Sequence, residues 1–296
     1  MKTISIVIPA KDEAQNLARL LPALTRKFSS AQIIVVNDGS TDNTADICHK
    51  YGVEVISNPY SMGNGAAIKA GARQATGEIL VFMDGDGQHN PSDIPKLLNK
   101  LDEGYSMAIG ARSYKSQASV SRLLGNSAFN RLASLMSGFK ILDLTSGFRA
   151  VTAQRFKNFL YLLPNGFSYP TTITMAFFRS GYAVAYIPIE AAQRLGTSNI
   201  NIIRDGLRFF IIILKIGALF SPMRLFLPIS LFHFFIGIAY YTYTYIAYGR
   251  FTNMSALLLI ASLLTFLIGI VSEQISALHY RNSEERRRIS DQSTNE

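Results

Sequence analysis

The sequence has 296 residues, 48% of them hydrophobic, which is enough for one sizeable domain and an appendage. Its single cysteine, Cys48, excludes an internal disulfide and fits a reducing compartment. The net charge of +9 suits nucleic acid, anionic lipid or phosphorylated substrates as binding partners. Nucleic acid is disfavoured, because the sequence has no dense basic helix and no basic strand with interspersed aromatic residues.

The first eighty or so residues alternate between short apolar runs and helical patterns. Predicted strands lie at 4–8, 33–36, 53–56 and 79–83, and predicted helices at 16–24, 44–50 and 66–75. This alternation is typical of βαβ units on a mostly parallel sheet, so the expected fold class is α/β. A further strand is predicted to end at Arg112.

Acidic turns follow three of the predicted strands. They contain Asp12-Glu13, Asn37-Asp38 and Asp84-Gly-Asp86. Ligands of parallel sheets bind at the carboxyl ends of the strands, so three such turns predict a site for a nucleotide and its metal. The sequence lacks a Gly-x-Gly-x-x-Gly after the first strand and a Walker-type Gly-Lys-Ser/Thr, which argues against dinucleotide cofactors and P-loop chemistry.

Asp84, Asp86 and Gln88 are spaced two residues apart directly after a predicted buried strand. If the backbone stays extended, the three side chains project to one side. Hard oxygen ligands of this kind suit Mg²⁺ or Mn²⁺, which takes the rest of its shell from water and substrate phosphates. The alternative interpretation is an Asp/Gly-rich turn after a core strand.

Four motifs together resemble family 2 glycosyltransferases with the GT-A fold, in particular the polyprenyl- and dolichyl-phosphate sugar synthases. The motifs are Ser5-Ile-Val-Ile-Pro-Ala-Lys-Asp-Glu13, Val36-Asn-Asp-Gly-Ser-Thr-Asp-Asn-Thr44, Asp84-Gly-Asp-Gly-Gln88 and Thr145-Ser-Gly-Phe-Arg149. The resemblance covers about residues 1–200 and implies a Rossmann-like, mostly parallel catalytic domain.

The resemblance also implies roles for individual residues. Binding of the donor nucleotide is expected from Pro9, Ala10, Glu13, Asp38, Asp84 and Arg194. The metal on the donor diphosphate is expected on Asp84, Asp86 and Gln88, which makes Asp86 a catalytic candidate. Arg194 belongs to a segment, 193–199, that resembles the family's mobile loop, although Asn199 stands where the family usually has lysine.

The remaining catalytic candidates concern the acceptor. The resemblance implies a basic residue near each of two positions for the acceptor phosphate, and Arg112 and Arg122 are the candidates. Arginine suits this role, since its planar guanidinium matches phosphate geometry. Arg122, Asn126 and Asn130 are four residues apart and share a helix face. For either arginine the alternative is a solvated surface position. Asp143 is expected beside the sugar or the acceptor, with a cap or turn role as the alternative.

The last third of the sequence has the pattern of a membrane anchor. Arg204, Arg208 and Lys215 form a basic stripe on a predicted amphipathic helix over 201–221, which fits a membrane surface or, alternatively, a docking partner. Residues 225–248 and 254–272 carry no charge and are each long enough to span a bilayer.

These patterns divide the chain into four expected parts. They are a catalytic domain at 1–200, the surface helix at 201–221, a transmembrane hairpin at 222–280 and a disordered cytoplasmic tail at 281–296. Basic residues flank the hairpin on its outer sides, which predicts a multi-pass protein of the cytoplasmic (inner) membrane with the catalytic domain and both termini in the cytoplasm. Gly237 and Gly269 could allow close helix packing, which leaves a homo-oligomer open.

The function expected from the resemblance is transfer of a sugar from a UDP- or GDP-linked nucleotide sugar to a polyprenyl phosphate, with inversion and with Mg²⁺ or Mn²⁺. One alternative is a processive polysaccharide synthase, but those enzymes carry a Gln-x-x-Arg-Trp motif and this chain has no tryptophan. Another is a non-catalytic membrane scaffold or lipid-carrier binding protein, against which the intact set of Asp84, Asp86 and Gln88 argues.

Overall fold

The computed structural model describes residues 2–112, 120–166, 169–190, 211, 214–215 and 217–293. The chain forms two compact units. The first contains Met1–Arg131 and Phe139–Asn201, and the second contains Leu132–Gly138 and Ile202–Glu296. Residues 132–138 of the expected catalytic domain thus belong to the second unit, which otherwise begins at Ile202.

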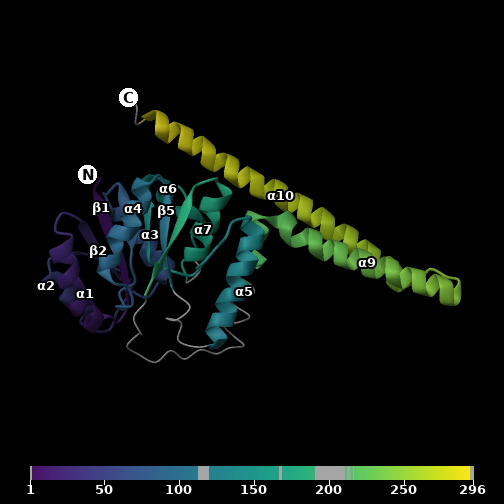
Figure 1. Cartoon of the computed structure of the whole chain (residues 1–296), viewed down its shortest axis with the longest axis horizontal. Helices are drawn as coiled ribbons and strands as arrows, with labels where there is room; N and C mark the ends of the chain where they lie inside the picture. Colours follow the sequence, from purple (N-terminus) through teal and green to yellow (C-terminus); the bar gives the residue numbers. More distant parts are fainter. Residues whose placement is uncertain are drawn as a thin grey trace. The chain divides into compact units, whose positions relative to one another are not determined.

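A seven-stranded sheet forms the centre of the first unit (Figure 1). Its strands are β1 (Ile4–Ala10), β2 (Gln32–Asn37), β3 (Glu54–Ser57), β4 (Ile79–Phe82), β5 (Met107–Arg112), β6 (Arg149–Thr152) and β7 (Val184–Ile189). Their order is β3-β2-β1-β4-β6-β5-β7. The β6 strand pairs antiparallel with β4 and β5, and the other recorded pairings are parallel.

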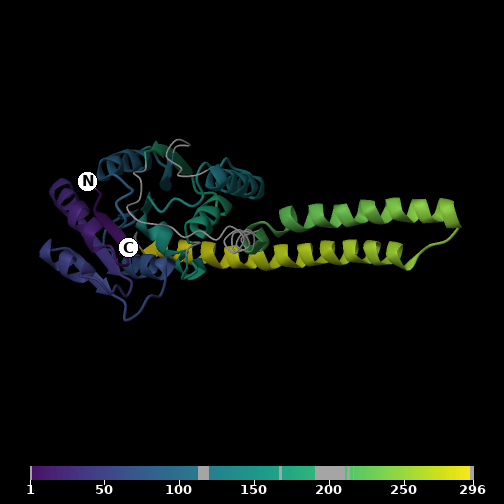
Figure 2. The ribbon, with the colours of Figure 1, turned by 90° about the horizontal axis from the view of Figure 1, so that it is seen from below.

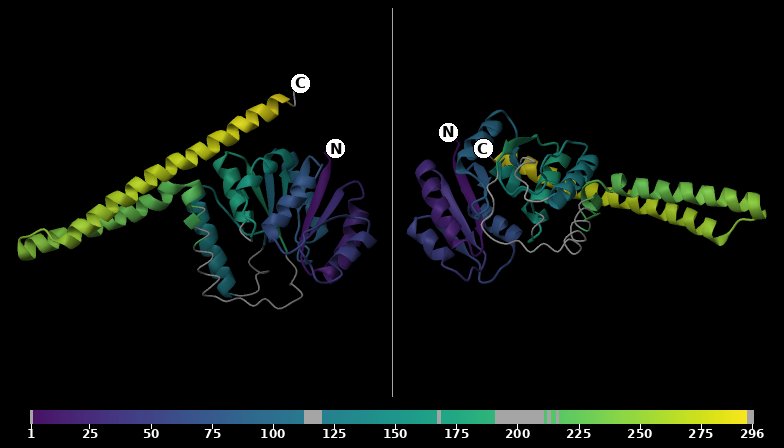
Figure 3. Two further views of the ribbon diagram at one scale, coloured as in Figure 1. Left: turned by 180° about the vertical axis from the view of Figure 1, so that it is seen from behind. Right: turned by 60° about the horizontal axis from the view of Figure 1, so that its bottom comes forward.

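Helices pack on both faces of this sheet (Figure 3). They are α1 (Ala14–Lys27), α2 (Thr44–Lys50), α3 (Asn64–Gln74), α4 (Ile94–Asp102), α6 (Ala153–Lys157) and α7 (Tyr169–Arg179). A further helix, α5 (Val120–Ser137), lies between β5 and β6 in the chain. Side chains alternate along β1, so Ile6 and Ile8 join the core cluster of α1 and α4. Val7 points to the opposite face, where α3 approaches so closely that a Cβ on Gly71 would lie 2.3 Å from Val7 Cγ1.

The predicted strands and helices of the first hundred residues are confirmed, with shifts of a few residues at their ends. The α2 helix has the predicted bounds, and the sheet is mostly parallel as expected. The sequence analysis did not predict β6. Phe148 of the motif at 145–149 is fully buried directly before this strand.

In the second unit, α9 (Pro222–Tyr248) and α10 (Asn253–Ser293) run side by side as a hairpin (Figure 2). Ser230 Oγ donates to the carbonyl of Ser262 (2.9 Å), and Ser262 Oγ donates to the carbonyl of Ser230 (3.0 Å). Gly237 faces Leu258 and Leu259 of the opposite helix. Small residues and hydroxyl groups of this kind are typical of helix packing inside membranes.

Gly269 also faces the opposite helix, where a Cβ would lie 2.9 Å from Cβ of Phe226. Both glycines that were expected to leave room for a second copy thus serve packing within one chain. The predicted close approach of the helices at both glycines is therefore confirmed, and a homo-oligomer stays a prediction.

Both hairpin helices are long and apolar enough to cross a membrane. In their apolar windows only 11% and 17% of the residues are buried, so they are not the core helices of a soluble domain. Arg224 lies at the start of α9 and donates to the carbonyls of Leu135 (3.2 Å) and Met136 (2.8 Å). It thereby satisfies carbonyls at the C-terminal end of α5, which otherwise have no helical partner.

Two expectations for the C-terminal part need correction or fall outside the description. The α10 helix continues to Ser293, so the expectation of a disordered tail from residue 281 is wrong for 281–293. Glu and Arg are good helix formers, and they extend a helix that the preceding span has already nucleated. The amphipathic helix was predicted over 201–221, where only residues 211, 214–215 and 217–221 are described. All of these except Ser221 are helical.

Candidate active site

The three acidic turns lie together at the carboxyl edge of the sheet, as the sequence predicts. They follow β1, β2 and β4, which are neighbours in the sheet and run parallel. The amide of Asp38 donates to the carbonyl of Ala10 (2.9 Å), which joins the first two turns. A Cβ on Gly85 would lie 3.2 Å from the carbonyl oxygen of Pro9, so the third turn touches the first.

Asp38 organises the loop that leads into α3. Its Oδ1 accepts hydrogen bonds from Asn58 Nδ2 and the Met62 amide (2.8 Å each). Its Oδ2 accepts from Ser61 Oγ (3.0 Å) and the Gly63 amide (2.8 Å). Burial alone would raise the pKa of this carboxyl, but the four hydrogen bonds outweigh burial and lower the pKa. The carboxylate predicted to hold the nucleoside therefore also fixes residues 58–63.

We expect Asp38→Asn to destabilise the fold without any ligand present. An amide cannot accept four hydrogen bonds, so at least one buried donor loses its partner, at a cost of about 2 kcal/mol. Thermal melting should show a loss of about 4–8 °C. Because the folded-state pKa of Asp38 lies below its ordinary value of 3.8, the stability difference should be complete above about pH 4 and shrink as the pH falls. An unchanged melting temperature would contradict this structural role and leave Asp38 with a role in ligand binding alone.

The turn after β1 interlocks with the turn after β2. Asp12 has a positive φ of 55°, and its Oδ1 accepts from the Thr41 amide (2.7 Å). The amide of Glu13 donates to Thr44 Oγ1 (3.1 Å), and its Oε2 accepts from Asn16 Nδ2 (2.6 Å). These bonds bring Pro9, Ala10 and Glu13 to the same edge as Asp38, as a common nucleoside site requires.

The segment from Asp84 to Gln88 departs from the extended geometry assumed in the sequence analysis. The chain turns at residues 85–86, Gly87 has a φ of 74°, and the Gln88 amide donates to Asp86 Oδ1 (3.1 Å). Glycine and an aspartate that binds its own backbone favour a turn over an extended strand. The premise that alternation along a strand aligns the three side chains is therefore wrong.

The turn nevertheless keeps the carboxylates of Asp84 and Asp86 close enough to Arg112 to interact with its charge. The pKa of Arg112 is raised, because the hydrogen-bonded Asp143 and then Asp84 and Asp86 favour its charged form against the opposing effect of burial. Among the described residues, no three His, Cys, Asp or Glu side chains form a metal cluster. Two carboxylates and a donor diphosphate are a normal ligand set for Mg²⁺ or Mn²⁺, so these residues fit such a cation.

The backbone of Gly147 borders Asp84 directly. A Cβ at Gly147 would lie 2.7 Å from Asp84 Oδ2 and 2.9 Å from Oδ1. Any other residue at this position would therefore push the carboxylate away. The glycine of the Thr145-Ser-Gly-Phe-Arg motif thus leaves room for the carboxylate that is the first candidate metal ligand.

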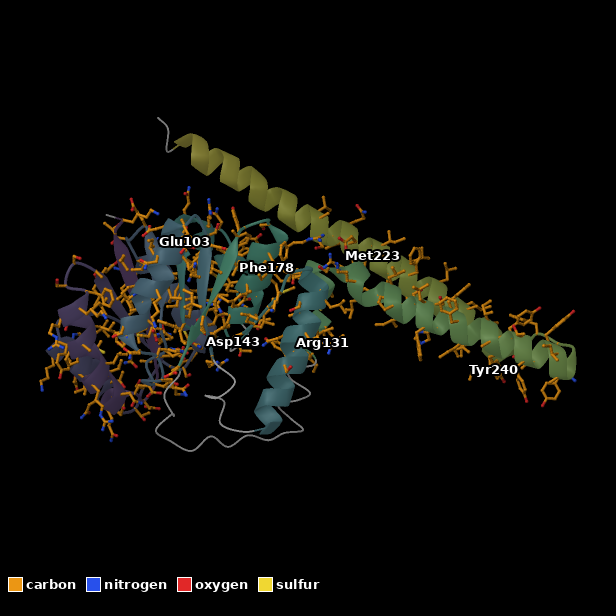
Figure 4. All side chains as sticks on the ribbon, viewed as in Figure 1. Glu103, Arg131, Asp143, Phe178, Met223 and Tyr240 are labelled. Carbon is orange, nitrogen blue, oxygen red and sulfur yellow. The ribbon has the colours of Figure 1, made fainter. Side chains whose placement is uncertain are left out.

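Arg112 and Asp143, both predicted to be catalytic, form a bidentate ion pair at this edge (Figure 4 labels Asp143). Arg112 Nε donates to Asp143 Oδ2 (2.8 Å), and Nη2 donates to Oδ1 (2.9 Å). Nη2 also donates to Thr145 Oγ1 (2.6 Å). Burial would raise the pKa of Asp143, but the bonds from Arg112 outweigh it and hold the pKa below its ordinary value. The pair holds the guanidinium of Arg112 in one orientation.

Asn130 of α5 holds the loop that carries Asp143. Its Nδ2 donates to the carbonyl of Leu142 (2.7 Å), and its Oδ1 accepts from the Leu144 amide (3.0 Å). The two bonds bracket Asp143 from either side in the sequence. The sequence analysis placed Asn130 on the face of Arg122 but gave it no role.

The structure describes only part of the predicted acceptor and donor set. Arg122 lies within α5, but its side chain is outside the described part of the chain. Arg194, Asn199, Arg204 and Arg208 also lie outside the described residues. Their roles remain predictions from the sequence.

Arg149 and His89 are two residues near the site that the sequence analysis did not assign. Arg149 is completely buried and donates to the carbonyls of Ser146 and Pro170 and to Thr174 Oγ1. His89 is 6% exposed and stacks on Phe148. The available signal for Arg149 was a basic residue at the start of an apolar strand. The available signal for His89 was the adjacent acidic turn.

A mixed sheet with acidic turns at its carboxyl edge and a basic residue facing them has the architecture of the GT-A fold. The sequence profile of glycosyl transferase family 2 matches residues 5–159, and the chain belongs to this family. The profile of the GtrB C-terminal hairpin matches residues 221–278, which contain α9 and most of the apolar part of α10.

Similar proteins agree with this assignment. Glycosyltransferase AglJ of Haloferax volcanii is 26% identical over 93% of this chain and 94% of its own length. Dolichyl-phosphate hexose transferase of the same organism is 29% identical over 69% of this chain and 89% of its own length. The fold is similar to glucosyl-3-phosphoglycerate synthase of Mycobacterium tuberculosis, crystallised with Mn²⁺ and UDP (TM-score 0.59, 22% identity, 73% of this chain and 80% of that one).

Proposed function

We propose that this glycosyltransferase moves a sugar from a nucleoside diphosphate sugar to a polyprenyl phosphate at the surface of the cytoplasmic membrane. The observation that carries the proposal is that the turn with Asp84 and Asp86 and the Arg112–Asp143 ion pair lie at the same edge of the sheet. This edge offers carboxylates to a metal-bound diphosphate and a guanidinium to a phosphate. The name of the dolichyl-phosphate hexose transferase supports a lipid phosphate as the acceptor.

In the proposed reaction, an oxygen of the acceptor phosphate attacks the anomeric carbon in line with the bond to the donor diphosphate. That bond breaks with inversion, and the nucleoside diphosphate leaves with the electron pair. A phosphate monoester is largely dianionic near neutral pH, so its attack requires no strong base. The side chains around it need to position it and to balance its charge.

The residues divide this work between them. Pro9, Ala10, Glu13 and Asp38 are proposed to hold the nucleoside, with Arg194 as a clamp on the diphosphate. Asp84, Asp86 and Gln88 would hold Mg²⁺ or Mn²⁺, which screens the charge of the leaving diphosphate when bound. Arg112 and Arg122 would bind the acceptor phosphate, and Asp143 keeps the fork of Arg112 in one orientation.

The function is tested with the full chain in detergent, radiolabelled UDP- and GDP-linked sugars, and a polyprenyl phosphate. We expect one donor to give a chloroform-soluble product, lost with a chelator and restored by Mn²⁺ or Mg²⁺. Full activity in the chelator would contradict the metal. A water-soluble polymer would favour a processive synthase, and the lack of both transfer and donor binding would favour a scaffold.

We further propose that the catalytic unit and both termini face the cytoplasm. Arg224 lies before the first span and Arg281 after the second, whereas the turn between them carries only Arg250. Tyrosines gather at the other end of α9, where Figure 4 labels Tyr240, and the ring of Tyr241 contacts those of Tyr245 and Phe251. Aromatic residues favour the membrane–water interface, which suits the non-cytoplasmic side for this turn.

Cysteine labelling tests this orientation, because the only native cysteine is buried. In intact cells, a membrane-impermeant maleimide should modify a Phe251→Cys variant in the turn. A matched Ser29→Cys variant, exposed after α1, should react only after permeabilisation. The reverse pattern would place the catalytic unit outside.

A further inference from the structure

His89 presents a buried nitrogen that has no hydrogen-bond partner in the described part of the chain. Its ring stacks on Phe148 with 4.9 Å between the ring centres and an angle of 16°. Nδ1 is buried and unpartnered. Buried polar atoms in folded proteins are nearly always hydrogen-bonded, so an exception beside an active site indicates a functional reason.

Nδ1 of His89 faces the carboxylate of Asp84. The distance from Nδ1 to Asp84 Oδ2 is 4.0 Å, which is about 1 Å too long for a hydrogen bond. The same Oδ2 lies against the backbone of Gly147. The next residue, Phe148, stacks against the imidazole ring of His89. One short segment therefore limits the movement of both the carboxylate and the ring that faces it.

An imidazole ring carries an N–H on at least one of its two nitrogens, and that proton can be on Nδ1. The Nδ1 of His89 can therefore donate to the carboxylate that it faces.

We propose that His89 is a positioning residue, which donates Nδ1–H to Asp84 and holds this carboxylate in the orientation that binds the metal of the donor diphosphate. The proposal rests on the proposed function, since it presumes a cation at Asp84. Outer groups that donate hydrogen bonds to metal ligands typically change metal affinity by about 10–100-fold when they are removed.

The test compares two substitutions in the full chain in detergent. His89→Phe keeps an aromatic ring against Phe148 but removes the nitrogen. We expect it to melt at or above the wild-type temperature, because an unpartnered buried nitrogen is gone, and to bind Mn²⁺ about tenfold more weakly. His89→Asn keeps an N–H near the position of Nδ1 but loses the stack. It should melt at a lower temperature than His89→Phe and yet bind Mn²⁺ more tightly.

Mn²⁺ binding is measured directly by electron paramagnetic resonance with the metal alone, and stability by thermal melting without metal. The matched control is Tyr186→Phe, which removes another buried unpartnered polar atom and should leave Mn²⁺ binding unchanged. We thus expect His89→Phe to be the more stable variant and His89→Asn to be the tighter metal binder. If His89 served packing alone, the more stable variant would not be the weaker metal binder.

Two outcomes would overturn the inference. In the first, His89→Phe binds Mn²⁺ as tightly as the wild type does. In the second, the two variants follow the same order in stability and in metal affinity. A wild-type chain that binds no Mn²⁺ and is fully active with chelator would instead contradict the metal in the proposed function. The two failures are thus distinguishable.

Discussion

Replacing Asp86 with alanine is expected to reduce sugar transfer by about a thousandfold while the protein stays folded. Charge stabilisation by a bound cation contributes several kcal/mol to a transition state, and each 1.36 kcal/mol corresponds to about a factor of ten in rate. Asp86 is partly exposed in a turn, so its removal should change the melting temperature by no more than about 2 °C.

The assay for Asp86→Ala follows transfer at saturating metal and donor, together with thermal melting. Asp102→Ala is the matched control, because it removes an aspartate charge that pairs at the surface with Lys2 (3.5 Å). The control should retain wild-type activity. A folded Asp86→Ala protein with more than a tenth of wild-type activity would show that Asp86 is not a ligand of the catalytic cation.

The second large effect is expected at the ion pair of Arg112 and Asp143. Removing one member leaves the other charge without its partner in a largely buried place, at a cost of about 3 kcal/mol. Arg112→Ala and Asp143→Ala should therefore each lower stability, whereas the double variant should lose less than the sum, with a coupling of about 1–3 kcal/mol. Thermal melting of the four proteins completes the cycle.

The same variants separate a structural role from a role in acceptor binding. If Arg112 binds phosphate, the KM for polyprenyl phosphate should rise far more than the KM for the nucleotide sugar in Arg112→Ala. Arg112→Lys should rescue little, since lysine cannot form the bidentate fork. Arg26→Ala, which removes an exposed arginine of α1, is the control. A change confined to the donor KM would remove Arg112 from the acceptor site.

The stability of the Arg112–Asp143 pair depends on pH in a defined direction. The pKa of Asp143 in the folded protein lies below its ordinary value, so the stabilisation it provides is present above about pH 4. It is lost as the pH falls through the lowered pKa. The coupling measured in the double-mutant cycle should therefore be largest near neutral pH and shrink in acid.

Much of the architecture follows from local patterns in the sequence. Short apolar runs, polar turns and helical repeats succeed one another within about ten residues, and this spacing alone predicts strands whose carboxyl ends share one edge. Residues 4–10, 32–37 and 79–82 therefore bring Glu13, Asp38 and Asp84 to that edge. The uncharged runs within 222–278 predict the apolar hairpin for an equally local reason, since charge is costly in a bilayer.

The pairing partners inside the site were decided only by the tertiary structure. Asp143 meets Arg112 across 31 residues of sequence, and Asp38 binds a loop 20–25 residues further along. Such contacts depend on strand order and register, and the antiparallel β6 strand fixes where residues 143–148 lie. No periodicity in the sequence encodes that register.

The sequence by itself thus determined the family, the edge of the sheet that carries the site, and the two apolar helices. The tertiary structure decided that the Asp84–Gln88 segment turns, that Gly147 borders Asp84, and that His89 is buried with an unpartnered nitrogen facing that carboxylate. The physical reason is that residue type and spacing describe the neighbours of a residue along the chain. Burial, charge state and the direction of a side chain depend on segments that folding brings from elsewhere.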